Sequence, residues 1–214
     1  MIARLFLPIL LLSFAACAYA QSPAQRLFEA IDEDKPLVAE GIVALGKVDL
    51  GARNKERETP LHRAIEKDMK PLAELLVKAG APLGARSTTG ETPLHLAALH
   101  ADPVYVDLLL NARADPNARN DEGESVLQWA VMTGNPRTVK RLLEGGSDIR
   151  IRDLRGNTLL HSAADGGQEE LAAALLNLGV DPRLRNRAGK RAIDVARERG
   201  YEGLAGLLER FEKE

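Results

Sequence analysis

The chain has 214 residues, of which 28% are charged, and its 29 basic and 31 acidic residues leave a formal net charge of −2. This near balance argues against nucleic acid as a ligand, because binding to phosphates needs an excess of basic side chains. The single cysteine excludes an internal disulfide, and the scarcity of aromatic residues (4%) requires a core of aliphatic side chains.

Residues 1–20 have the composition of a signal peptide. Arg4 is their only charge, and small residues precede the predicted cleavage before Gln21. The uncharged run at 5–20 is shorter than the roughly 20 apolar residues that a membrane-spanning helix needs. Cys17 offers an alternative, because the residues before it weakly resemble a bacterial lipobox and would make it a lipid anchor. Cleavage before Gln21 is the favoured interpretation.

Beyond this segment, the chain repeats itself every 33 residues. Three columns of identical residues share the period, and such a coincidence indicates a stacked array of equal units. The alanine column is Ala64, Ala97, Ala130, Ala163 and Ala196; the arginine column is Arg53, Arg86, Arg119, Arg152 and Arg185; the leucine column is Leu76, Leu109, Leu142, Leu175 and Leu208.

Each period predicts a turn, a short helix, a second turn and an apolar second helix. The first turns end at Gly90, Gly123, Gly156 and Gly189, where glycine accepts the conformation that follows a type I turn. Helix N-caps are predicted at Thr59, Thr92, Ser125 and Thr158. In the turn one period before Gly90, Arg57 stands at the glycine position, so we expect that turn to differ in shape.

The helix starts carry a recognisable signature. Thr59-Pro60-Leu61-His62 and Thr92-Pro93-Leu94-His95, together with the variant that begins at Thr158, resemble the ankyrin repeat over about residues 24–214; a 33-residue period is typical of that family. The resemblance implies an all-α ankyrin-repeat solenoid of helix-turn-helix units with β-turn fingers, about five to six units including terminal caps. It also implies a protein-binding role and no enzymatic activity.

The predicted organisation is a signal peptide at 1–20 and an ankyrin repeat domain at 21–214. Within the domain we expect a cap at about 24–53, repeats at about 54–86, 87–119, 120–152 and 153–185, and a C-terminal repeat at 186–214.

Three histidines at the period, His62, His95 and His161, raise the question of a metal site. Successive helices in a stack lie about 8–10 Å apart, whereas the ligands of one zinc ion must all lie within about 2.0–2.1 Å of it. The resemblance instead implies that these histidines hydrogen-bond neighbouring turns. His161 and Ser162 diverge by about 100° on a helix and do not form a catalytic pair. We expect no catalytic, cofactor or metal site.

The arginine column and Trp129 each have two interpretations. The arginines could line one edge and bind a polyanion, or lie solvated beside the turns, and the second interpretation is favoured. Trp129 could be a binding hot spot or pack between units, as Leu96 would one period earlier; here the core is favoured.

In the family the usual binding surface is concave, formed by the finger tips and the exposed side of each first helix. Carried over by position, the candidate tip and finger-base residues are Lys55, Glu56, Thr88, Thr89, Glu91, Asp121, Glu122, Glu124, Leu154, Arg155, Asn157, Arg187 and Lys190. The candidate helix positions are Glu66, Lys67, Leu99, His100, Met132, Thr133 and Asp165.

The leader and the resemblance together predict an exported protein that binds another protein in the periplasm of a Gram-negative bacterium, where it would stabilise or regulate an enzyme; the oligomeric state is unknown, with a monomer favoured, and secretion from the cell is a less favoured location. Two alternatives stay open: an immunity protein that neutralises a toxic effector enzyme, and a lipid-anchored envelope scaffold. The sequence does not name the partner, the source organism or the biological process.

Overall fold

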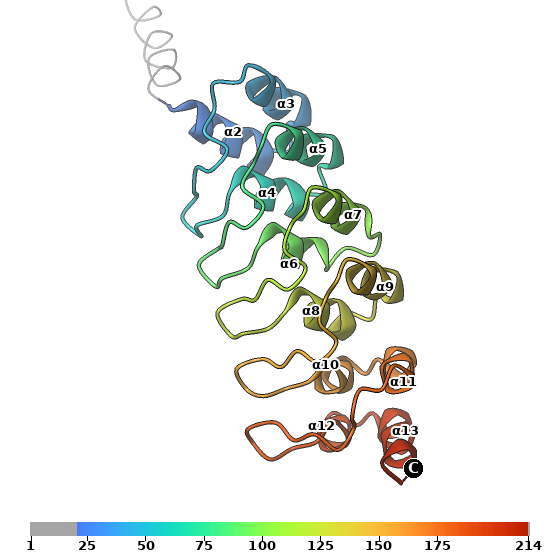
Figure 1. Ribbon diagram of the computed structural model, residues 1–214. Helices are drawn as coiled ribbons and strands as arrows, with labels where there is room; N and C mark the ends of the chain where they lie inside the picture. The colour runs from blue at the N-terminus through green and yellow to red at the C-terminus, as the bar shows by residue number, and fades with distance from the viewer. Residues whose placement is uncertain (1–20, 214) are drawn as a thin grey trace, which may run out of the picture.

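The computed structural model describes residues 21–213, which form twelve α-helices and no named strand (Figure 1). The predicted all-α ankyrin-type solenoid is therefore confirmed. The proposed signal peptide and Cys17 lie outside the described residues. The helices are α2 (Pro23–Asp32), α3 (Pro36–Ala44), α4 (Pro60–Glu66), α5 (Lys70–Lys78), α6 (Pro93–Ala97), α7 (Val104–Asn111), α8 (Val126–Met132), α9 (Pro136–Glu144), α10 (Leu159–Gly166), α11 (Glu169–Asn177), α12 (Ala192–Glu198) and α13 (Glu202–Lys213).

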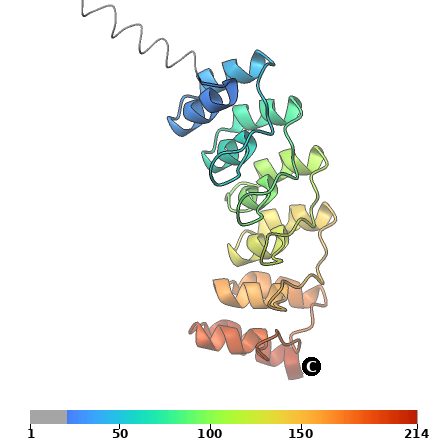
Figure 2. The same ribbon diagram turned by 90° about the vertical axis from the view of Figure 1, so that its left-hand side faces the viewer.

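The helices form two layers that run the length of the stack. The even-numbered helices make an inner layer beside the extended finger loops, and the odd-numbered helices make an outer layer (Figure 1). The pairs follow one another in chain order (Figure 2), and the main helix contacts join a helix to its own partner or to the adjacent pair. Each unit is thus stabilised by its neighbours, as expected for a repeat array.

The alanine and leucine columns form the core of the stack. All five alanines are fully buried on the inner helices, and the five leucines on the outer helices are at most 1% exposed. Because alanine has the smallest side chain that still favours a helix, it lets neighbouring inner helices approach closely. The sequence prediction of aligned, buried columns is confirmed.

The predicted N-caps begin the inner helices. Thr59, Thr92, Ser125 and Thr158 all have extended backbone before a helix. In each case the side chain three residues later turns back to the cap: the Thr59 N–H donates to His62 Nδ1 over 3.1 Å, and the Ser125 N–H donates to Gln128 Oε1 over 3.0 Å. Histidine therefore takes the role that glutamate or glutamine has in a capping box.

The finger turns have one shape, including the turn that lacks glycine. Gly123 has φ +75°, and Arg57, at the equivalent position, has φ +59°. The Arg57 N–H donates to the Asn54 carbonyl over 3.0 Å, as the Gly123 N–H does to the Asn120 carbonyl over 3.0 Å. The expected difference in shape is therefore wrong: the hydrogen bonds of the finger impose a left-handed conformation on an arginine, which costs roughly 1–2 kcal/mol.

One pair of successive outer helices, α9 and α11, is packed less closely than the others. α9 and α11 have few close contacts, whereas α8 and α10 pack tightly in the inner layer below them. Between the two outer helices lies an apolar groove of about 290 Å³, lined by Val139, Leu143, Leu171, Leu175 and Leu178 among others. We call this feature the outer groove; Figure 1 shows α9 and α11 as successive helices of the outer layer.

Candidate partner-binding surface

The fingers are joined by a ladder of main-chain hydrogen bonds. In each finger after the first, one backbone N–H donates to a carbonyl of the preceding finger, so the loops support one another although they are not strands. A surface held in this way loses little conformational entropy when a partner binds. The bonds are Thr88 N–H to Glu56 O (2.8 Å), Asp121 N–H to Thr89 O (3.0 Å), Leu154 N–H to Glu122 O (2.9 Å) and Arg187 N–H to Arg155 O (2.8 Å).

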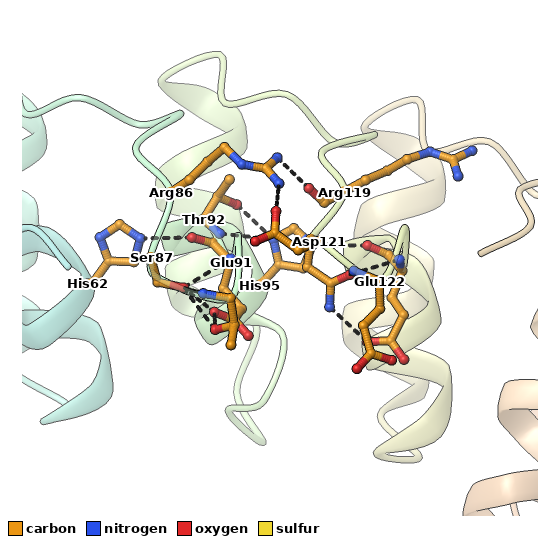
Figure 3. A network of polar contacts seen from close by, with 12 residues as sticks. His62, Arg86, Ser87, Glu91, Thr92, His95, Arg119, Asp121 and Glu122 are labelled. Atoms are coloured by element: carbon orange, nitrogen blue, oxygen red, sulfur yellow. Dashed lines mark hydrogen bonds and ion pairs between the residues drawn. The ribbon is translucent and has the colours of Figure 1, made fainter. Parts of the chain in front are cut away.

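The arginine column forms a second ladder beside the first. Each guanidinium reaches one period forward and donates to the carbonyl of the next arginine in the column: Arg53 to Arg86 (2.5 Å), Arg86 to Arg119 (2.6 Å), Arg119 to Arg152 (2.7 Å), and Arg152 to Arg185. Figure 3 shows the Arg86 rung, where the same guanidinium also holds the Asp121 carboxylate. All five arginines are exposed beside the turns, as the favoured interpretation has it, but their guanidinium groups also bond backbone carbonyls, which the sequence did not predict.

The histidine column makes a third connection, and here the prediction is confirmed. His62 Nε2 lies 3.2 Å from the Glu91 carbonyl and His95 Nε2 lies 3.4 Å from the Glu124 carbonyl (Figure 3). Since Nδ1 accepts from the cap N–H, the proton must be on Nε2, which then donates to the finger of the next unit. His161 bonds the Lys190 carbonyl over 2.9 Å in the same way.

Burial keeps these histidines neutral. Desolvation lowers the pKa of His62 and of His95 to about 4, and it lowers the pKa of His161 as well. Within residues 21–213 no cluster of three potential metal ligands occurs. His161 is also committed to Thr158 and to the Lys190 carbonyl, so it has no free ring nitrogen with which to activate Ser162.

The candidate residues from the sequence lie along the finger side of the stack. The finger tips are exposed at Lys55, Glu56, Thr88, Thr89, Asp121, Glu122, Leu154, Arg155 and Arg187, and the residues after the turn glycines, Glu91, Glu124, Asn157 and Lys190, are half-buried. At the ends of the inner helices, Glu66, Lys67, Leu99, Met132 and Thr133 are exposed, whereas His100 and Asp165 are half-buried.

These candidates are not gathered into one site. A hollow of about 870 Å³ lies at the C-terminal half of the concave face, between the last three fingers and the inner helices. We call it the concave hollow. Eight candidates line it: Glu124, Met132, Leu154, Arg155, Asn157, Asp165, Arg187 and Lys190. The other twelve do not line it.

The concave hollow combines charged and apolar groups. Leu154 is 54% exposed and Met132 is 37% exposed. Arg155 pairs with Glu122 over 2.5 Å, Lys190 pairs with Glu198 over 2.7 Å, and Arg199 pairs with Asp165. Arg187 forms no ion pair within residues 21–213. Apolar anchors ringed by charges are typical of a surface that binds another macromolecule.

Comparison with known proteins identifies the repeats. A family model described as "Ankyrin repeats (3 copies)" matches residues 27–120, 103–186 and 127–212. The chain belongs to the ankyrin repeat family. Ankyrin repeats are protein–protein interaction modules, and the ankyrin fold is typically a non-catalytic binding scaffold. No curated protein matches the chain significantly, and none of the helices at 21–213 is long and apolar enough to cross a membrane.

The sequence analysis missed one column of the ankyrin array that faces the concave side. Trp129 packs against the core, as predicted, but is only partly buried: its Nε1–H donates to Glu124 Oε2 over 2.8 Å and its ring centroid lies 5.4 Å from that of His95, edge to face. One and two periods later, Ser162 and Val195 line the concave hollow. The signal was available in the sequence, because a serine in this column is untypical of a core position.

Proposed function

We propose that this ankyrin array is exported and binds a partner protein through the concave hollow, in the periplasm of a Gram-negative bacterium. The observation that carries the proposal is the hollow itself, a preformed recess with exposed Leu154 and Met132 between fingers that three sets of hydrogen bonds hold in place. Its lining has no arrangement of nucleophile and base, which favours recognition over catalysis.

Export is supported by the sequence of residues 1–20, with its single charge and its small residues before Gln21. The array needs no disulfide, since the hydrogen-bonded ladders and the aliphatic core stabilise it without one. We propose that the bound partner is an enzyme of the envelope, which the array stabilises or regulates. A standard interface would cover about 800 Å² on each protein. We expect it to extend from the concave hollow onto neighbouring finger tips.

Site-specific crosslinking in intact cells tests this function. A photo-reactive residue at Leu154, 54% exposed on the concave side, is compared with one at Leu178, 59% exposed beside the outer groove. We expect a crosslinked partner from Leu154 and none from Leu178, and mass spectrometry of the adduct identifies the partner. Crosslinking only from Leu178 would place the binding surface on the opposite face; no adduct from either position would contradict a partner in that compartment.

The N-terminal mass of the purified protein tests the proposed processing. Cleavage by a signal peptidase leaves Gln21 as the first residue. An acylated Cys17 would instead show the lipid-anchored form, and an unprocessed N-terminus would contradict export through this leader.

A further inference from the structure

The ladders of the ankyrin fingers have a direction and end at the last finger. Arg185 stands in the arginine column, yet its guanidinium bonds only its own turn, at the Gly189 carbonyl over 2.5 Å. The four earlier arginines each reach a carbonyl of the following finger. Within residues 21–213 no finger follows at this edge, and the remaining N–H groups of Arg185 have no acceptor in this part of the chain.

The main-chain ladder ends at the same edge. The Ala188 carbonyl stands one period after the Arg155 carbonyl, which accepts from the N–H of Arg187 in the next finger. No backbone N–H within the described chain occupies the equivalent position beyond Ala188. The last finger therefore offers an unused acceptor and unused donors side by side, in the pattern that joins each of the earlier fingers to its successor.

A second copy of this chain does not complete the pattern. The chain enters α2 directly from its N-cap Ser22, so the first helix pair has no finger in front of it within the described residues. A copy stacked head to tail would place α2 and α3 against α12 and α13, but it would bring no finger to the edge beside Arg185. Head-to-tail stacking of two copies therefore leaves the acceptor and the donors of this edge unused.

The charge of the last finger indicates what kind of chain fits. Arg183, Arg185, Arg187, Lys190 and Arg191 lie within nine residues. Arg191 pairs with Glu212, and Lys190 pairs with Glu198. Neither Arg185 nor Arg187 forms an ion pair within residues 21–213, and both are exposed, although the charge of Arg185 helps to lower the pKa of Asp194. A guanidinium bonds a carboxylate about twice as strongly as a neutral acceptor, so this edge favours an acidic ligand.

We propose that an extended, acidic segment of the partner protein adds to the last finger as the next rung of both ladders. A backbone N–H of the segment donates to the Ala188 carbonyl, as in β-strand addition. A carboxylate of the segment accepts from Arg185, and a second carboxylate reaches Arg187 at the rim of the concave hollow. The inference rests on the proposed function and specifies the chemistry of the partner at that site.

Fluorescence anisotropy with the full processed protein tests the proposal. The probe is a labelled peptide of alternating glutamate and threonine, with a glutamine–threonine peptide and inorganic polyphosphate as comparisons. We expect binding of the acidic peptide that weakens as salt is added, and a loss of about tenfold or more in affinity in Arg185→Gln and in Arg187→Gln. Arg137→Gln, at an exposed position of α9, is the matched control and should change the affinity less than about twofold.

Four outcomes would overturn the inference: no binding of the acidic peptide, equal binding of the glutamine peptide, equal loss in the Arg137 variant, or polyphosphate binding that removes any preference for peptide. The proposed function is separated from it by combining Arg185→Gln and Arg187→Gln with the crosslinker at Leu154. If the partner is still captured in full by that variant, the concave face binds it and the basic edge at Arg185 and Arg187 does not contribute.

Discussion

Removal of one arginine from the middle of the ladder should destabilise the array more than removal of the last. Arg119 donates to the Gly123 carbonyl over 3.2 Å and to the Arg152 carbonyl over 2.7 Å, so Arg119→Met loses a bond within its own finger and a bond to the next. Hydrogen bonds from charged groups contribute about 1.5–3 kcal/mol each when buried, and solvent screening at this exposed position reduces that value. We expect a loss of about 1–2 kcal/mol in the free energy of unfolding.

Arg185→Met is the matched comparison, because Arg185 bonds only the Gly189 carbonyl of its own finger. We expect it to cost at most about 0.5 kcal/mol. Both variants are unfolded in urea, with helix content followed by circular dichroism and the indole environment followed by Trp129 fluorescence. Equal losses in the two variants would refute the reasoning, since the bond to the next unit would then contribute nothing. A loss below about 0.3 kcal/mol for Arg119→Met would refute it as well.

Three further predictions concern the turns and the histidines. Arg57→Gly should raise the melting temperature by about 2–4 °C, because glycine relieves about 1 kcal/mol of strain at φ +59°; differential scanning calorimetry measures it, and no rise would mean that the arginine is unstrained. Gly123→Val should cost more than about 2 kcal/mol, since a Cβ there would lie 2.8 Å from Leu154 Cγ and 2.9 Å from Leu154 N in addition to the strain at φ +75°; unchanged urea unfolding would contradict the turn assignment. In the folded protein His95 stays neutral down to its pKa of about 4, whereas in the unfolded chain a histidine binds a proton near pH 6.5. The contribution of His95 to the free energy of unfolding is therefore fully present above pH 6.5 and is lost as the pH falls from 6.5 to 4. Between pH 7.5 and 5 this histidine should lower the free energy of unfolding by about 2 kcal/mol. His95→Gln introduces the residue that the next unit has at Gln128 and should remove this part of the pH dependence. If the urea midpoints at pH 7.5 and pH 5 differ as much in the variant as in the original protein, His95 is not responsible.

The periodic columns predicted the fold because they report burial directly. An alanine at every 33rd residue identifies the contact between inner helices, and the helix starts at Thr59 and Thr92 follow from local chemistry. The hydrogen bonds of the arginine column to the next unit were not predicted, for a physical reason. A long guanidinium side chain beside a turn can extend into solvent or reach a backbone carbonyl one unit away, and the acceptor has no sequence signature.

The location of the concave hollow could not be predicted from the sequence either. Equivalent finger positions are present in every unit, yet the concave hollow lies at the last three, where its lining includes side chains such as Leu154 and Arg187. The partner itself remains a proposal, because neither the repeat pattern nor the family match specifies it. The apolar anchors and unpaired arginines of this region indicate its chemistry only.

The outer groove has a mechanical consequence for the array. α9 and α11 are loosely packed on one side of the α8–α10 contact, while the rungs from Arg119 to Arg152 and from Leu154 to Glu122 bridge the other side. We therefore expect this joint to bend more easily on the side of the outer helices than on the side of the fingers, where hydrogen bonds span it. If α9 and α11 move closer together, the fingers on the other side must separate and these hydrogen bonds must lengthen. The hydrogen bonds between the finger that contains Glu122 and the finger that contains Leu154 therefore limit how far the last two units can move away from the rest of the array when a partner binds.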